Sequence, residues 1–151
     1  KIHDDLAGGR GLHVARADRR RGRGGTLVPS PVKAAAIELG LPVTTDPADV
    51  VGLDADLGVV VAFGRLIKTP VLEAVPMVNL HFSLLPRLRG ASPVQTALLD
   101  GAQVTGVSTI VMNEGMDTGP VLLQRPEPVR PEDDAGSLGD RLAEVGAQLQ
   151  H

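Results

Sequence analysis

The chain has 151 residues, which fits one domain with its own hydrophobic core. Its composition, with 42% hydrophobic and 22% charged residues, is that of a soluble globular protein. There is no apolar run of about 18 residues for a membrane span, no cysteine for disulfides or thiolate metal sites, and a net charge of only −3. These features predict a cytoplasmic protein with no membrane partner. The histidine spacing also predicts no metal.

The first part of the chain alternates short apolar runs with turns. Residues 12–15 (LHVA) predict a short strand, and residues 18–25 (DRRRGRGG) predict a basic, glycine-rich loop. Ser30 followed by Pro31 is an N-cap signal for a helix. The alanine-rich run that follows continues this helix, and Gly40 ends it.

The middle of the chain predicts two strands separated by a helix. Residues 45–56 indicate a turn with a short helix, and residues 57–63 (LGVVVAF) indicate a strand buried on both faces. A short helix is expected over residues 69–74. The next strand is expected over residues 78–81, and a helix begins at Ser92-Pro93 and closes near residue 101.

The last part predicts two strands and a long helix. Residues 104–112 form one strand, and residues 121–124 pair beside it. One helical stripe follows at the spacing i, i+4, i+7 and i+11, made by Leu138, Leu142, Val145 and Leu149. Strands and helices that alternate at these lengths predict an α/β fold with βαβ units on a mostly parallel central sheet.

An amide and an imidazole stand close together at the end of a predicted strand. Asn79 and His81 are two residues apart, so both side chains leave the same face of the strand. The loop that follows contains Ser83, Leu84, Leu85 and Pro86 and is basic. Ligands of parallel sheets bind beyond the carboxyl ends of the strands, where this pair lies. Polar side chains there must find partners or take part in chemistry.

A carboxylate follows the strand over residues 104–112. Asp117 lies between Gly115 and Gly119, which have access to backbone angles closed to other residues and could aim the carboxylate inward. Taken alone, this segment is more readily explained by a hairpin turn with a solvated aspartate.

The two segments together supply an amide, an imidazole and an acid, without a nucleophile motif such as GxSxG. This set suits direct attack of an amine on a carbonyl-like carbon, with no covalent enzyme intermediate. Asn79 and His81 would stabilise the oxyanion, and Asp117 would hold the imidazole and accept a proton, directly or through water.

These motifs resemble the folate-dependent formyltransferase family. The resemblance implies a Rossmann-like three-layer sandwich, with 10-formyltetrahydrofolate as the formyl donor. It also implies that Asn79, His81 and Asp117 are catalytic. The folate-contacting segment is then SLLP, made by Ser83, Leu84, Leu85 and Pro86.

The basic loop and the PSPVK helix start resemble the family branch that acts on initiator tRNA. This resemblance implies formyl transfer to the α-amino group of methionyl-initiator tRNA, with phosphate contacts from Arg19, Arg20, Arg21 and Arg23. An isolated arginine run would instead be a solvated turn. Other hypotheses stay open: a small amine acceptor, such as glycinamide ribonucleotide or an amino sugar nucleotide, or a non-catalytic remnant that binds folate or tRNA.

The resemblance is partial at both ends. The family begins with a strand and a glycine turn, and residues 1–11 do not match them, so the first strand is expected to be missing. The family branch also has a C-terminal tRNA-binding barrel domain, which is expected to be absent. We therefore expect residues 1–151 to form a partial catalytic domain.

Overall fold

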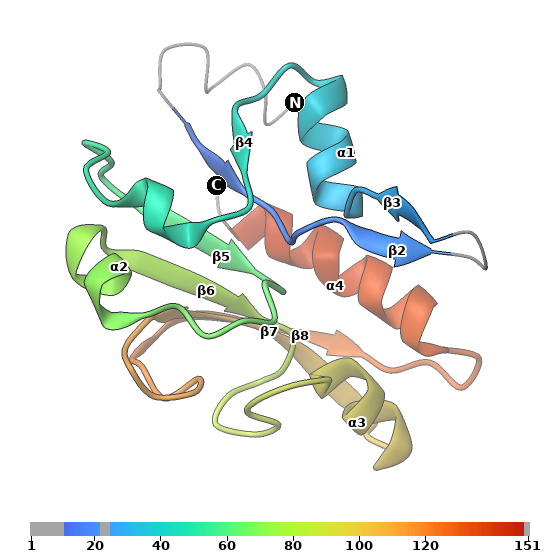
Figure 1. The fold of residues 1–151 in the computed structure, drawn as a ribbon. Coiled ribbons are helices and arrows are strands. Elements are labelled where there is room, and N and C mark those ends of the chain that lie inside the picture. Colours follow the sequence, from blue (N-terminus) through green and yellow to red (C-terminus); the bar gives the residue numbers. More distant parts are fainter. Residues whose placement is uncertain (1–10, 22–24, 150–151) are drawn as a thin grey trace.

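A four-stranded sheet forms the centre of the fold in the computed structural model, which describes residues 11–21 and 25–149 (Figure 1). The sheet has the order β5-β6-β7-β8. Its strands are β5 (Gly58–Val61), β6 (Met77–His81), β7 (Val104–Val111) and β8 (Val121–Pro128). The α/β class is confirmed. Within this sheet the predicted βαβ arrangement holds for β5 and β6, which pair in parallel with α2 between them.

The rest of this sheet is antiparallel, so the sheet is mixed rather than mostly parallel. β7 runs antiparallel to both β6 and β8. The link from β7 to β8 covers only residues 112–120. A parallel crossover needs a dozen or more residues, whereas a hairpin needs only a few. The pattern of apolar runs shows where strands lie but does not show their direction.

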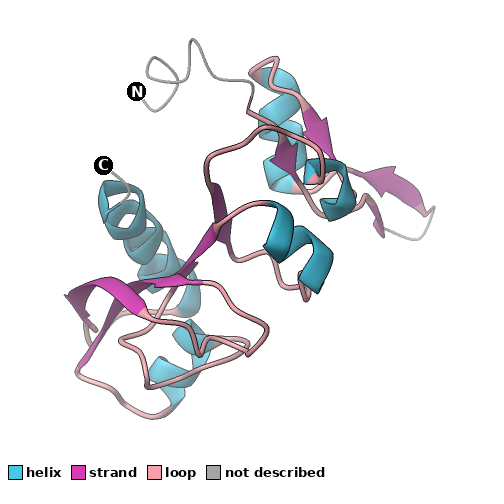
Figure 2. Cartoon of the chain, turned by 90° about the vertical axis from the view of Figure 1, so that its left-hand side faces the viewer, coloured by secondary structure: helices cyan, strands magenta, loops and turns pink. Residues whose placement is uncertain are grey.

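Two smaller strand pairs come from the N-terminal part. β1 (His13–Val14) pairs in parallel with β4 (Val43–Thr44), and β2 (Arg19–Arg21) pairs antiparallel with β3 (Thr26–Val28). Residues 19–21 of the expected basic loop are therefore a strand, and β3 and β4 were not predicted either. Figure 2 shows this N-terminal part as a group of elements beside the larger sheet.

The observed helices agree closely with those predicted from the sequence. Ser30 caps the first helix by accepting a hydrogen bond from the Lys33 N–H at 3.3 Å. The helical segments are α1 (Pro31–Glu38), the 3₁₀ helix η1 (Pro47–Val50), α2 (Thr69–Ala74), α3 (Pro93–Leu99) and α4 (Ala135–Leu149). None of the helices in the described part of the chain is long and apolar enough to cross a bilayer.

The sheet has a core on each face, which gives the three layers expected of the fold. On one face Leu80 and Val107 pack with Val94 of α3 and with Leu138 and Leu142 of α4. The stripe predicted for the last helix is thus confirmed as a core face. On the other face the second core is made by Ile67, Val71, Val75 and Met77.

β5 differs from the prediction of a strand buried on both faces. Val59 is 51% exposed and Val61 is 47% exposed, while Val60 packs against the second core. The physical reason is its position, because β5 is an edge strand that is hydrogen-bonded only to β6 within the described residues. Burial of a β-branched run on both faces requires covering layers on both sides.

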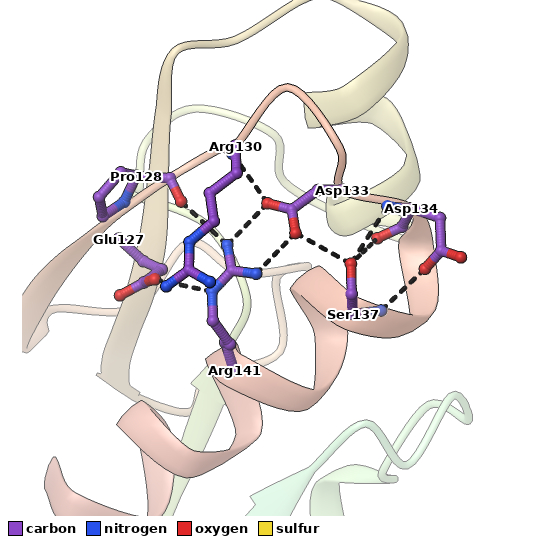
Figure 3. A network of polar contacts seen from close by, with 7 residues as sticks. All are labelled: Glu127, Pro128, Arg130, Asp133, Asp134, Ser137 and Arg141. Atoms are coloured by element: carbon purple, nitrogen blue, oxygen red, sulfur yellow. Dashed lines mark hydrogen bonds and ion pairs between the residues drawn. The ribbon is translucent and has the colours of Figure 1, made fainter.

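A carboxylate–guanidinium network fastens α4 to β8 (Figure 3). Both Arg141 Nη atoms donate to Asp133, at 2.6 and 2.7 Å, and Arg141 Nε donates to Glu127 at 2.9 Å. The Arg130 N–H and the Ser137 hydroxyl also donate to Asp133. These hydrogen bonds, those from Arg141 above all, hold the pKa of Asp133 well below its usual range.

The Asp133→Asn variant is expected to be less stable than the wild type at pH 7 because it loses this ion pair. The folded-state pKa of Asp133 lies below that of the unfolded chain, so its stabilisation is complete above the unfolded value. It is then lost as pH falls below about 4. Urea unfolding of both proteins between pH 3 and pH 7 measures this difference. The exposed Asp140→Asn on α4 is the control and should show no such pH-dependent gap.

Candidate active site

The structure brings Asn79, His81 and Asp117 together. Asn79 and His81 leave the same face of β6, and Asp117 comes from the loop between β7 and β8. Asn79 Nδ2 donates to Asp117 Oδ1 at 3.1 Å, and His81 Nδ1 lies 3.5 Å from Asp117 Oδ2. The His81 and Asp117 side chains are only 7% and 13% exposed. The carboxylate therefore joins the amide to the imidazole in a largely desolvated place.

The loop that carries Asp117 uses its glycines differently from the prediction. Asp117 itself has a positive φ of 51°, whereas neither Gly115 nor Gly119 is in the left-handed region. A Cβ at Gly119 would lie 1.7 Å from the Val111 carbonyl oxygen, and a Cβ at Gly115 would lie 2.1 Å from Thr118 Oγ1. Glycine is needed at both positions because a side chain there would meet neighbouring atoms. The strained backbone angle of this loop is that of Asp117 itself.

His81 is held at both ring nitrogens. Its Nε2 lies 2.8 Å from the carbonyl oxygen of Leu88, and its Nδ1 faces Asp117. A carbonyl can only accept, so Nε2 carries a proton. The backbone N–H of Gly90 donates to Asp117 Oδ2 at 2.8 Å. Leu88 and Gly90, which the motif analysis did not single out, thus hold the imidazole and the acid through their backbone.

The SLLP segment lies beside this cluster, and two of its side chains are internal. Ser83 and Leu85 are buried, and Ser83 Oγ donates to the Arg87 carbonyl at 2.6 Å. Leu84 is partly buried, and Pro86 is exposed after a cis peptide bond. Leu84 and Pro86 therefore have side-chain surface for a ligand.

Two polar residues support this segment and were missed by sequence reasoning. Ser108 Oγ accepts from the Leu85 N–H, and Gln124 Nε2 donates to the Leu85 carbonyl. Ser108 is completely buried. The sequence points to Ser108 only in that it places a hydroxyl in the middle of an apolar strand, where a buried polar group requires a partner.

A small cavity adjoins the cluster, and a larger one has none of the three candidate catalytic residues in its lining. The smaller, about 20 Å³, is large enough for a water-sized group. Its lining is made by Asn79, Ile110, Met112, Asn113, Gly115 and Asp117. The larger has a volume of about 380 Å³. It lies between the start of α2 and the loop after β7, where Thr69 Oγ1 donates to Glu114 at 2.9 Å.

Three of the four predicted tRNA-contacting arginines form strand β2 (Arg19–Arg21). Arg19 and Arg20 are exposed on β2, and Arg20 Nη1 donates to the Gly25 carbonyl at 3.0 Å. Arg21 is placed through its backbone in β2, and Arg23 lies outside the described residues. An ion pair of 2.8 Å between Lys33 and Asp18 joins α1 to the segment before β2.

The fold agrees with what comparison with known proteins finds. The chain belongs to the formyl transferase family, whose sequence profile matches residues 44–150. The Rossmann-like fold is confirmed by solved structures. The chain has a TM-score of 0.70 and 27% identity to glycinamide ribonucleotide transformylase 1 of Symbiobacterium toebii, covering 80% of this chain and 65% of that one.

Relatives at higher identity are methionyl-tRNA formyltransferases. The chain is 51% identical over 147 residues to that of Synechococcus sp. (strain CC9605), covering 90% of this chain and 44% of the relative. It is 47% identical over 148 residues to that of Heliobacterium modesticaldum, covering 91% and 46%. The chain therefore spans less than half the length of these curated relatives.

Proposed function

We propose that this domain transfers a formyl group from 10-formyltetrahydrofolate to the α-amino group of methionine on initiator tRNA. The observation that carries the proposal is the contact of one carboxylate, Asp117, with both Asn79 and His81. Residues 1–151 would be the catalytic portion of such an enzyme.

The chemistry needs few groups from the protein. The amine nitrogen bonds to the formyl carbon, giving a tetrahedral intermediate, and the bond from that carbon to the folate nitrogen then breaks. Asn79 retains one N–H that Asp117 does not use, and this N–H is suited to the developing oxyanion. Asp117 accepts the amine proton, which ends on the folate nitrogen.

In this scheme His81 does not bind the oxyanion directly. Both of its ring nitrogens already face protein oxygens, those of Leu88 and Asp117. It therefore lies beside the acid in an orientation that the Leu88 carbonyl fixes. Contact with the substrate oxyanion would require exchange of the Leu88 hydrogen bond.

The choice of acceptor rests on two further observations. The relatives of 47–51% identity carry the name methionyl-tRNA formyltransferase, whereas the solved glycinamide ribonucleotide enzyme is only 27% identical. The exposed Arg19 and Arg20 on the hairpin suit phosphate oxygens. Both favour a tRNA acceptor over a small amine.

The test is incubation of the chain with radiolabelled formyl donor and three acceptors in parallel: methionyl-initiator tRNA, glycinamide ribonucleotide and an amino sugar nucleotide. We expect label on the tRNA. Label on a small amine alone would overturn the acceptor assignment, and no transfer to any acceptor would contradict the enzymatic proposal. Folate binding by calorimetry without transfer would support a binding-only remnant.

The hairpin arginines are expected to act through charge. The double variant Arg19→Ser, Arg20→Ser should bind initiator tRNA more weakly, and its slope of log K against log salt should be smaller by about two, because two phosphate contacts are lost. Titration of tRNA binding across salt concentrations measures both. The control is the double variant Arg125→Ser, Arg130→Ser, which changes the same charge on and after β8. Equal effects of the two pairs would contradict a specific role for the hairpin.

A further inference from the structure

A row of polar residues crosses the sheet beside the candidate active site. His81 of β6 is paired with Ser108 of β7, which is in turn paired with Gln124 of β8. Residues directly opposite one another on antiparallel strands point to the same face. All three side chains therefore lie on the face that carries Asn79 and the SLLP segment.

Ser108 and Gln124 of this row hold the start of the loop after β6. Ser108 Oγ donates to the Ser83 carbonyl at 2.6 Å and accepts from the Leu85 N–H at 3.0 Å. Gln124 Nε2 donates to the Leu85 carbonyl and to Ser108 Oγ, each at 2.8 Å. Both backbone polar groups of Leu85 are thus paired with side chains from neighbouring strands.

The same loop returns to the first member of the row. Ser83 Oγ donates to the Arg87 carbonyl at 2.6 Å, and the next carbonyl, that of Leu88, accepts from His81 Nε2 at 2.8 Å. Leu88 is held at a positive φ of 54°, a conformation that persists only where its surroundings impose it. The position of this carbonyl decides which ring nitrogen carries the proton.

We propose that Gln124 and Ser108 are positioning residues that place the Leu88 carbonyl and thereby keep the His81 proton on Nε2, with Nδ1 turned to Asp117. They act through the loop: within the described part of the chain, their side chains hydrogen-bond to Ser83, to Leu85 and to each other. The effect on catalysis rests on the proposed function. The effect on the imidazole does not.

The experiment measures the imidazole directly in the full chain labelled with ¹⁵N-histidine. Gln124→Glu keeps the size of the side chain but cannot donate to the Leu85 carbonyl at neutral pH. We expect the His81 Nε2 proton to exchange with water at least about tenfold faster, the effect of losing roughly one hydrogen bond, and the ring ¹⁵N shifts to move toward a mixture of tautomers. Gln103→Glu, an exposed residue before β7, makes the same chemical change and should leave the His81 signals unchanged.

Gln124→Met serves as a second variant without the added charge, should the glutamate prevent folding. It removes the same donor from an edge strand. Changed His81 signals in a folded Gln124 variant, with the control unchanged, support the proposal. Wild-type His81 signals in a folded Gln124 variant overturn it, even if the melting temperature falls.

Formyl transfer provides a separate readout. The Gln124 variants should lower kcat about tenfold, by the same hydrogen-bond estimate, with the KM for the formyl donor within about twofold. If the wild type transfers no formyl group but the Gln124 variants change the His81 signals, the proposed function is contradicted and the positioning role is supported. The reverse result, normal transfer and unchanged signals in the variants, would reject the positioning role alone.

Discussion

The Asp117→Asn variant is expected to lose formyl transfer by roughly 10²–10⁴-fold, the usual contribution of a positioned proton acceptor. Asparagine is the informative substitution because it tolerates the positive φ of 51° at this position, whereas alanine would add backbone strain. It keeps the size of the side chain but removes the charge that faces His81. Single-turnover transfer of labelled formyl measures the loss.

The control for this variant is Asp54→Asn, an exposed residue before β5. It should transfer formyl at the wild-type rate. Equal melting temperatures for Asp117→Asn and wild type would show that the fold is retained. A rate for Asp117→Asn within about twofold of wild type would remove Asp117 from the mechanism, because a proton acceptor is worth far more than that.

The Gly119→Ala variant is expected to lose about 3 kcal/mol of unfolding free energy, near the upper end for overpacked sites. Its new Cβ would lie 1.7 Å from the Val111 carbonyl oxygen and 2.9 Å from the carbonyl carbon, so the hairpin backbone must move. That movement also displaces the loop that carries Asp117. Urea unfolding gives the loss of stability, and the transfer assay should show a lower rate as well.

Gly139→Ala is the matched control for this substitution. Gly139 lies inside α4, and a Cβ there meets no atom within 4 Å. The same change should therefore stabilise the protein by roughly 0.5–1 kcal/mol, because alanine favours the helix. Similar effects of the two substitutions would contradict the close approach at Gly119.

The sequence predicted the elements that depend on local signals. The Ser30-Pro31 cap and the leucine stripe of Leu138 and Leu142 each carry their information within a few residues, and both were confirmed. The exposure of β5 could not be predicted, because it depends on which strands lie beside it. The antiparallel pairing of β7 and β8 depends on their short link rather than on their composition.

The side chains of the candidate site could be predicted from the sequence, but the groups that hold them in place could not. Asn79 and His81 share a face because a strand has a period of two, and the family motif points to Asp117. The roles of the Leu88 carbonyl and of Gln124 could not be predicted. They arise from the register between distant strands and from loop backbone, which leave no pattern in the residue types.

The most direct test of the account is a double-mutant cycle between His81 and Asp117 on the single-turnover transfer rate. His81→Gln is suitable because its amide nitrogen can still donate to the Leu88 carbonyl while the contact with Asp117 is lost. If the two residues act as one unit, the double variant His81→Gln, Asp117→Asn should be about as slow as the slower single variant. Single effects that multiply in the double variant would mean that the two groups work independently, contrary to the contact on which the proposed mechanism depends.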